Sequence, residues 1–482
     1  MEREARVPGM EGKTVTVMGI GLHGGALAMI DWLLGRGAHV IATDTKTDEE
    51  LAPSLKLLRG LKNLTVVTGR HRIEDFKDVD MVIINPAVRW DNQYIRAALD
   101  NGVPVEMDAG LFFRTCPSKN VIGVTGTKGK TTTSLLLYEI IVSSGRKAVK
   151  VGIGQEAVMN KLSEINPETF VVFELSSWRL GALARAGISP HIAVVTNIYQ
   201  DHLNYYGSMS EYVADKQAIF RHHVNSDFLI LNLDNENVTQ TPVGALASKS
   251  RRLYFSMNGG KRACVFIESG AIGYRLEGRE GRICRLDEVG MRGDHNLGNV
   301  LAACTVAVLL GLDPEKIREA VLRFRGAPHR LELVKELNGV KFYNDTAATT
   351  PESGLAGIGS FSEDLFLIAG GSNKNLDLNA FAEGIAGADT IKGLFLLDGA
   401  ATRDLKDLVE RFGGASKIVG VYPDMGSAVS AAYGRCRDMT VPGSCRGVIL
   451  LSPGCASFGM FQNEFDRGDK FKAAVHAIVS EG

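Results

Sequence analysis

The stretch Val121–Leu137, VIGVTGTKGKTTTSLLL, places an apolar strand directly before a glycine-rich loop and a helix. Glycines in such a loop let backbone N–H groups approach phosphate oxygens, and the start of the helix adds a favourable dipole. Lys130 would neutralise the outer phosphates of a nucleotide, and the Thr131 hydroxyl would ligate Mg²⁺. The spacing departs from the strict Walker form, because Val124 stands where its first glycine belongs. The stretch still predicts a phosphate loop, formed by Gly126, Thr127, Lys128, Gly129, Lys130, Thr131 and Thr132.

Alternating strands and helices extend on both sides of this loop and predict an α/β protein with parallel sheets. A chain of 482 residues suggests roughly three domains. Apolar runs typical of strands are TVTVMGI, HVIATD and VDMVIINP before the loop and VKFYNDTA, DLFLIAGGSNK, GLFLLDG and GVILLSPG after it. Residues 227–290 read as short strands and turns of a small β appendage. We expect an N-terminal Rossmann-like domain at 1–117, a central phosphate-loop ATPase-like domain at 118–325 and a C-terminal Rossmann-like domain at 326–482.

Composition excludes several classes of partner. The net charge is −1 and no basic stripe is present, so we expect no nucleic-acid partner. The start, MEREARVPGMEGK, lacks the apolar core of a signal peptide, and no apolar run is long enough to span a bilayer. The seven cysteines form no CxxC pair. We therefore expect a reduced, cytoplasmic protein without a membrane partner.

Other polar residues surround the phosphate loop in the predicted order of strands. Glu174 ends the strand FVVFE, where a carboxylate can hold Mg²⁺ beside a nucleotide. His202 follows the strand HIAVVTN, and Lys216 lies on the next helix. Spacing alone gives these two no role, because a loop histidine and a surface lysine are the common interpretations. Near the start, Gly19–Gly24 reads GxGxxG with Asp44 20 residues later, a weak dinucleotide-binding signal.

Eight segments together resemble one family of enzymes. They are GTKGKTTT, ELSSWRL, TNIYQDHLNYYGSMSEYVADK, GDHNLGN, HRLE, ND-x-A-A-T, GGSNK and LSPGCASFGMFQNEFDRG. They occur in the order found in Mur ligases, which build the peptide stem of bacterial cell-wall precursors. The resemblance runs from Gly19 to about Lys470 and is greatest to the MurD type, which adds D-glutamate to UDP-N-acetylmuramoyl-L-alanine.

The resemblance implies an ATP-dependent ligase of peptidoglycan precursor synthesis that works through an acyl phosphate and releases ADP and phosphate. The implied catalytic residues are Lys130, Glu174, His202 and Lys216. Two Mg²⁺ ions are implied as cofactors, with Thr131, Glu174, His202 and a carbamylated Lys216 around them. The partners would be small molecules, UDP-N-acetylmuramoyl-L-alanine and glutamate, and the enzyme would be a monomer.

The same resemblance assigns binding residues in all three segments. For ATP it adds Asn296, Asn299, Arg330 and Asp345 to the phosphate loop. For the UDP-substrate it gives Leu22, His23, Asp44, Thr45, Lys46 and Ser176, so that GxGxxG would hold a uridine diphosphate. For the amino acid it gives Thr349, Lys374, Ser457 and Phe458.

Several positions depart from the family pattern and leave the amino acid open. Ala347 stands where the family has a lysine, Gly152–Gly154 lacks the usual asparagine, and Gly459 replaces an aspartate. Glu464 and Phe465 invert the usual order. L-glutamate or another amino acid is therefore an alternative to D-glutamate. More distant alternatives are an NAD-dependent dehydrogenase, a folylpolyglutamate synthase, another Mur enzyme and a nucleotide-binding switch without enzymatic activity.

Overall fold

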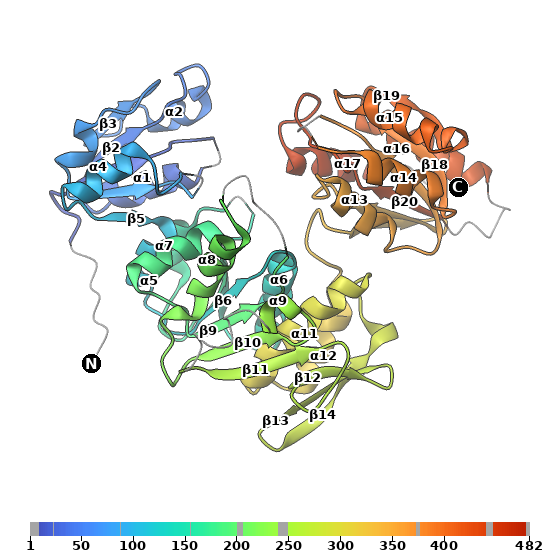
Figure 1. The fold of residues 1–482 in the computed structure, drawn as a ribbon, viewed down its shortest axis with the longest axis horizontal. Helices are drawn as coiled ribbons and strands as arrows, with labels where there is room; N and C mark the ends of the chain where they lie inside the picture. Colours follow the sequence, from blue (N-terminus) through green and yellow to red (C-terminus); the bar gives the residue numbers. More distant parts are fainter. Residues whose placement is uncertain are drawn as a thin grey trace. The chain divides into compact units, whose positions relative to one another are not determined.

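Three separate sheets, each built largely from parallel strands, organise the computed structural model of the chain (Figure 1). The structure describes residues 9–22, 24–86, 88–154, 156–199, 206–239, 249–372, 376–439 and 447–478, without the side chains of Asp294 and His295. The chain forms two compact units. One unit contains Met1–Val289 with Leu297–Leu322, and the other contains Gly290–Asn296 with Arg323–Gly482. The α/β class predicted from the sequence is confirmed.

The first sheet has the order β3-β2-β1-β4-β5, and all of its strands are parallel. The strands are β1 (Thr14–Met18), β2 (His39–Thr43), β3 (Leu64–Val67), β4 (Met81–Ile84) and β5 (Val105–Met107). Its helices are α1 (Gly25–Leu34), α2 (Ala52–Leu58), α3 (Glu74–Lys77) and α4 (Gln93–Asp100). The edge strand β3, LTVV, has only four residues, and its side chains are exposed or half-buried.

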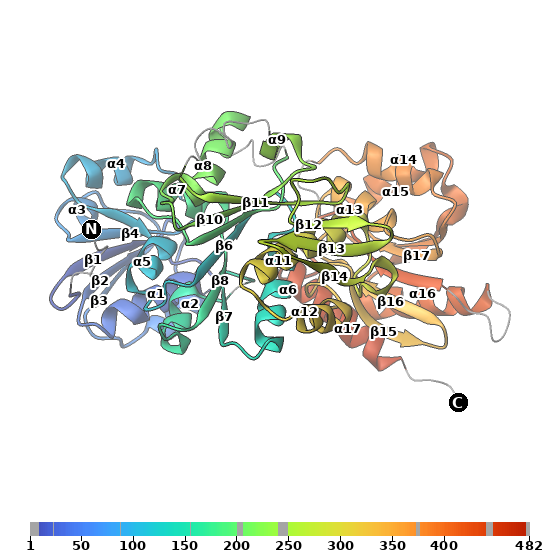
Figure 2. The ribbon, with the colours of Figure 1, turned by 90° about the horizontal axis from the view of Figure 1, so that it is seen from below.

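The second sheet contains nine strands in the order β14-β13-β12-β11-β10-β9-β6-β8-β7. The strands are β6 (Val121–Thr125), β7 (Ala148–Val151), β8 (Phe170–Glu174), β9 (Ile192–Val195), β10 (Phe228–Asn232), β11 (Arg251–Ser256), β12 (Val265–Glu268), β13 (Ala271–Leu276) and β14 (Arg279–Arg285). Strands β12 to β14 pair antiparallel and extend the sheet (Figure 2). The short strands and turns predicted for residues 227–290 are present, and they extend this sheet because β12 continues the ladder from β11.

Helices of two kinds accompany this second sheet. The α-helices are α5 (Asp108–Thr115), α6 (Lys130–Ser143), α7 (Ser177–Ala186), α8 (Met209–Arg221), α9 (Glu236–Thr239), α11 (Asp294–Leu309) and α12 (Pro314–Arg323). The 3₁₀-helices are η1 (Val158–Glu164) and η2 (Leu286–Glu288). Helix α5 joins the two sheets of this unit, because Phe112 on α5 meets Phe173 on β8 with ring centroids 5.2 Å apart. Both sheets thereby contribute to one apolar core.

The third sheet has the order β15-β16-β20-β17-β18-β19 and forms the other compact unit. The strands are β15 (Glu332–Leu337), β16 (Val340–Asn344), β17 (Asp364–Ala369), β18 (Ile391–Leu397), β19 (Ile418–Tyr422) and β20 (Gly447–Leu451). The helices are α13 (Pro351–Ile358), α14 (Asn379–Gly387), α15 (Thr402–Arg411), η3 (Ala415–Lys417), α16 (Met425–Asp438) and α17 (Glu464–Ala477). Apolar clusters pack on both faces of this sheet.

A fully buried arginine connects the loops at one end of the third sheet. Arg467 on α17 donates from Nε to Thr346 Oγ1 at 2.9 Å, from Nη2 to Thr346 O at 2.9 Å and from Nη1 to Cys455 O at 3.1 Å. Burial lowers the pKa of Arg467 to about 10, and the guanidinium remains charged at neutral pH. The loop after β16 and the loop after β20 are therefore held by the same side chain.

A buried carboxyl group follows β16 at the same end. Asp345 accepts hydrogen bonds from Leu331 N at 3.2 Å and from Ser452 Oγ at 2.9 Å. Burial raises the pKa of Asp345 to about 7, although those bonds and the charge of Arg330 act in the opposite direction.

None of the helices in the described part of the chain is both long and apolar enough to span a bilayer.

Replacing Arg467 should destabilise the third-sheet unit. Arg467→Met leaves buried carbonyls without donors, which should cost about 2–4 kcal/mol of unfolding free energy. The three tryptophans, Trp32, Trp90 and Trp178, lie in the other unit. Urea transitions followed by circular dichroism should therefore shift more than those followed by tryptophan fluorescence. The control is Lys470→Met, on the same helix and 51% exposed, which should change stability by less than about 0.5 kcal/mol. Equal shifts for the two variants would contradict this role of Arg467.

The buried carboxyl of Asp345 predicts a pH-dependent stability. Its folded-state pKa lies above the ordinary value, so its contribution to stability is complete below about pH 4 and is lost as the pH rises through about 7. The neutral amide of Asp345→Asn does not titrate. The melting temperature of this variant relative to the parent should rise by a few degrees, roughly 2–4 °C, between pH 5 and pH 8. A difference that stays constant with pH would show that Asp345 is not the titrating group.

Candidate active site

The phosphate loop leaves the second sheet where the strand order reverses. Strand β6, which precedes the loop, lies between β8 and β9. In open α/β sheets, ligands bind at the carboxyl ends of strands at such a switch point. Glu174 ends β8 and pairs with Val124 of β6, while Thr196 directly follows β9. Glu174 and Thr196 therefore lie at the same edge of the sheet as the phosphate loop.

Two glycines of the loop have backbone conformations and surroundings that exclude a side chain. Gly126 has φ +153°, and a Cβ there would lie 1.9 Å from Thr196 Oγ1. Gly129 has φ +84° and caps α6, and a Cβ there would lie 2.0 Å from Asn299 Oδ1. Thr131 and Thr132 lie in the first turn of α6. The loop is thus shaped as the sequence predicts, with bare backbone before a helix N-terminus.

The two residues directly after β9 hold the phosphate loop in place by hydrogen bonds. Thr196 Oγ1 donates to Lys128 O at 2.7 Å, Asn197 Oδ1 accepts from Lys128 N at 2.9 Å, and Asn197 O accepts from Thr127 N at 2.9 Å. Sequence reasoning missed this role of Thr196 and Asn197. The sequence signal for this role was their position at the end of the strand HIAVVTN, next to the predicted phosphate loop.

Two lysines converge on one carbonyl oxygen of the loop. Lys130 Nζ donates to Gly126 O at 3.0 Å and to Thr127 O at 3.1 Å, and Lys216 Nζ donates to Gly126 O at 2.9 Å. Lys216 is only 2% exposed, and its Nζ lies 4.6 Å from the ring centre of Tyr212. The interpretation of Lys216 as an exposed surface lysine is wrong, because α8 turns this residue inward against the loop.

Glu174 carries an atom that suits a cation. Its Oε2 is buried and has no hydrogen-bond partner among the described residues. A buried carboxylate oxygen without a donor is costly unless a cation or ligand completes it. No three His, Cys, Asp or Glu side chains cluster as a ready-made metal site in the part of the chain that the structure describes. Glu174 thus fits Mg²⁺ that takes its remaining ligands from phosphate, water and Thr131. The predicted ligand His202 lies outside the described residues.

An ion pair beside Glu174 was not anticipated. Arg179 on α7 pairs with Asp108 at the start of α5, with Nη2 and Oδ2 2.7 Å apart and Nε and Oδ1 3.2 Å apart. Its charge also interacts with Glu174. Ser176, predicted to bind the UDP-substrate, caps α7 by accepting from Arg179 N at 3.3 Å. The pair joins segments 71 residues apart, so sequence spacing could not reveal it.

The predicted UDP-substrate residues lie at the carboxyl edge of the first sheet. Asp44 follows β2 and accepts from Gly21 N and Lys46 N, both at 3.0 Å. Thr45 and Lys46 are exposed, and Leu22 is 51% exposed. His23 lies outside the described residues.

The remaining predicted nucleotide residues fall in the two units separately. Asn299 on α11 accepts from Thr133 Oγ1 at 3.4 Å and contacts the phosphate loop at Gly129. Asn296, one turn earlier on α11, belongs to the third-sheet unit, together with the exposed Arg330 and the buried Asp345. The charge of Arg330 lowers the pKa of Asp345, against the larger effect of burial, so Arg330 lies near this carboxyl group directly after β16.

The predicted amino-acid residues gather at the carboxyl edge of the third sheet. Thr349 follows β16, and Ser457 and Phe458 follow β20, which is the neighbouring strand. Gly454 N donates to Ala348 O at 2.9 Å and thereby joins these two loops. Ser457 is buried, whereas Phe458 is 55% exposed and accepts at its carbonyl from Ser372 Oγ. Lys374 lies outside the described residues.

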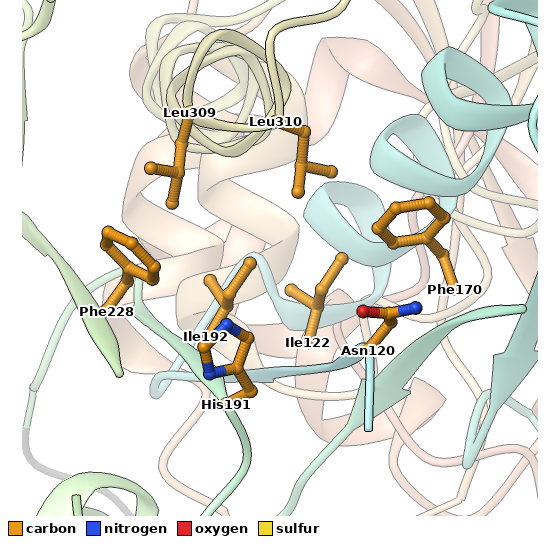
Figure 3. A pocket seen from close by; sticks show the side chains of 8 residues that line it. All are labelled: Asn120, Ile122, Phe170, His191, Ile192, Phe228, Leu309 and Leu310. Atoms are coloured by element: carbon orange, nitrogen blue, oxygen red, sulfur yellow. The ribbon is translucent and has the colours of Figure 1, made fainter. Parts of the chain in front are cut away.

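A small apolar cavity of about 180 Å³ lies at the opposite edge of the second sheet (Figure 3). It is lined by Asn120, Ile122, Phe170, His191, Ile192, Phe228, Leu309 and Leu310. These residues stand at the amino ends of β6, β8, β9 and β10 and at the end of α11. A strand of five residues spans about 16 Å, so this cavity is separate from the phosphate loop.

Two family models match the chain. Residues 13–106 match the Mur ligase MurD-like, N-terminal domain, and residues 124–307 match the Mur ligase middle domain. A UDP-N-acetylmuramoylalanine–D-glutamate ligase of Roseiflexus sp. (strain RS-1) is 40% identical over 98% of this chain and 100% of its own length. A ligase of the same name from Symbiobacterium thermophilum is 36% identical over 96% of this chain and 97% of its own length.

Solved structures share the fold across the whole chain. The UDP-N-acetylmuramate-alanine ligase MurC of Thermotoga maritima aligns with a TM-score of 0.58 at 19% identity, covering 96% of this chain and 99% of its own. The MurF ligase of Thermotoga maritima in complex with ADP aligns with a TM-score of 0.55 at 17% identity, covering 99% of each chain. Together with the full-length relatives and the two domain matches, this common architecture shows that the chain belongs to the Mur ligase family.

Proposed function

We propose that the chain is an ATP-dependent ligase that joins D-glutamate to UDP-N-acetylmuramoyl-L-alanine in peptidoglycan precursor synthesis. The observation that carries this proposal is the 40% identity to a UDP-N-acetylmuramoylalanine–D-glutamate ligase over the full length of both chains. The phosphate loop supports it, because bare backbone N–H groups before a helix N-terminus can bind the phosphates of ATP. We also propose 1–117, 118–325 and 326–482 as the limits of the domains that bind the UDP-substrate, ATP and the amino acid.

The chemistry requires one anion to attack another. The substrate carboxylate attacks the γ-phosphorus of ATP, ADP leaves, and an acyl phosphate forms. The amine of glutamate then attacks the acyl carbon, phosphate leaves and a proton is released. Carboxylate and phosphate repel each other, so positive charge must be fixed in place before they meet. Lys130 is suited to this task because its ammonium already lies over the loop, within 3.1 Å of two of its carbonyls.

Metal ions would complete this charge. Two Mg²⁺ ions, when bound, would neutralise phosphate oxygens, with Thr131 and Glu174 as ligands and His202 on the second ion. The buried Glu174 Oε2, which has no hydrogen-bond partner within the described ranges, supports this assignment. The role of the protein is to hold Glu174 at the end of β8, beside the loop.

Lys216 is proposed to carry a carbamate. Its ammonium would first lose one proton; the neutral amine nitrogen would then bond to the carbon of CO₂ and lose a second proton, so that an anion replaces a cation and two protons are released. A carbamate N–H can still donate to Gly126 O, where Nζ lies at 2.9 Å. Lys216 is buried and its Nζ shares the Gly126 carbonyl oxygen with Lys130, so a carbamate here would place a negative charge beside a second lysine. The resulting carboxylate would orient the ligands of the second Mg²⁺.

The choice of amino acid can be tested directly. With ATP, Mg²⁺ and UDP-N-acetylmuramoyl-L-alanine, phosphate release and a product of the expected mass should appear with D-glutamate and not with L-glutamate or the other amino acids of a panel.

Lys130→Ala should lower the rate by about 10²–10³-fold, because a preorganised charge is lost.

Turnover with L-glutamate alone would replace the D-glutamate assignment and draw attention to Ala347, where the family lysine is missing. Turnover by Lys130→Ala at the parent rate would contradict the mechanism itself.

The carbamate predicts a specific chemical rescue. Lys216→Ala should lose at least about 100-fold in rate, and added acetate should restore part of it by occupying the space of the carbamate carboxylate. Methylammonium should have no effect. The matched control is Lys130→Ala, which acetate should not rescue, because that position needs a cation. Rescue of Lys216→Ala by methylammonium and not by acetate would show that the free amine is the functional form.

A further inference from the structure

The cavity at the amino edge of the second sheet has apolar walls on every side. Ile122 and Ile192, both buried, lie at its base between the rings of Phe170 and Phe228, and two leucines at the end of α11 face them (Figure 3). All of its lining residues belong to the same compact unit. The cavity is therefore complete within that unit.

The size and lining of this cavity suit a small ring better than water. Its volume is about 180 Å³, and six of its eight lining side chains are apolar. An apolar protein cavity of about 150 Å³ holds benzene, whereas a water molecule needs two to four polar partners. The side chain of His191 on its wall is 36% exposed, so the cavity is open to solvent. A molecule of one or two rings can therefore enter.

A buried carboxylate fixes the histidine on this wall. Asp227 Oδ1 lies 2.9 Å from His191 Nδ1, and Asp227 Oδ2 accepts from Val224 N at 2.7 Å. A carboxylate can only accept, so Nδ1 carries the proton and Nε2 is the acceptor of the neutral ring. Nε2 has no hydrogen-bond partner within the described part of the chain. Figure 3 shows it directed into the cavity, to the side of the two leucines.

Asn120 supplies the second polar group of the cavity. Its Nδ2 donates to Pro167 O at 3.4 Å, and its backbone N donates to Ser118 Oγ at 3.0 Å. The amide oxygen therefore points away from Pro167 and toward the side on which His191 lies (Figure 3). The two polar atoms directed at the cavity are thus both acceptors, and a ligand must bring the donor.

We propose that this cavity is a binding site for a small planar aromatic molecule with an N–H or O–H donor at its edge, separate from the phosphate loop. The ring would pack among the apolar side chains, and its donor would bond to His191 Nε2. Anions are excluded as ligands, because Asp227 stands behind the histidine and the cavity presents no cation.

The test uses indole as the donor-bearing probe and benzofuran, which has the same shape without the N–H, as its matched control. Calorimetry at pH 8, where imidazole is ordinarily neutral, should show one indole per full-length chain. Indole should bind about 3–10-fold more tightly than benzofuran, because one hydrogen bond is added. His191→Leu should remove this difference and keep benzofuran binding.

A cavity-filling variant tests the location independently of the histidine. Leu309→Phe should weaken both probes at least about 10-fold, because the added ring occupies the cavity. Its control is Leu99→Phe, at a position that is 51% exposed on α4 of the same unit, which should bind like the parent. An excess of MgADP should not displace indole, because the strands separate the two sites.

The proposal would be overturned by a parent chain that binds no indole, or by equal affinities for indole and benzofuran. Parent-like binding in Leu309→Phe would place the probe elsewhere on the chain. Displacement of indole by MgADP would assign it to the nucleotide site and would likewise exclude the cavity. None of these results depends on which amino acid the ligase uses.

Discussion

The carbonyl oxygen of Gly126 is the point on which the central site depends. It accepts from Lys130 and from Lys216, so one backbone atom fixes the positions of two nitrogens on different helices. The oxygen can do this only because Gly126 has φ +153° and no Cβ to meet Thr196. Sheet order adds the third element, since β8 delivers Glu174 beside the same loop. The backbone conformation of Gly126, the two lysine side chains and the order of the strands therefore together determine the arrangement around this oxygen.

In the third-sheet unit, hydrogen bonds of a buried arginine hold the loops in place. Its loops carry the residues proposed for the amino acid, and they are joined by buried hydrogen bonds rather than by apolar contacts. Arg467 binds both the loop after β16 and the loop after β20, and Gly454 N binds Ala348 O between them. Buried polar networks of this kind are costly when incomplete and specify a single geometry when complete.

Much of this arrangement could be predicted from the sequence, because it depends on short-range patterns. The phosphate loop, the buried strands and the carboxylate at the end of FVVFE all follow from local order. The short edge strands β3 (LTVV) and β19 (IVGVY) were not singled out in the sequence, and β12 to β14 gave no sign that they continue the sheet. Contacts between distant segments, such as Asp108 with Arg179, were inaccessible, as was the inward turn of Lys216.

The frame around Arg467 has a consequence for how substrate choice can diverge among related ligases. The arginine contacts main-chain oxygens and one hydroxyl, so it reads no side chain at position 347. Replacing Ala347 by lysine would therefore add a positive charge near an incoming molecule without breaking the hydrogen bonds of Arg467. Recognition can in this way change by a single replacement at position 347, whereas position 459, where Gly459 has φ +96°, accepts a side chain only with backbone strain.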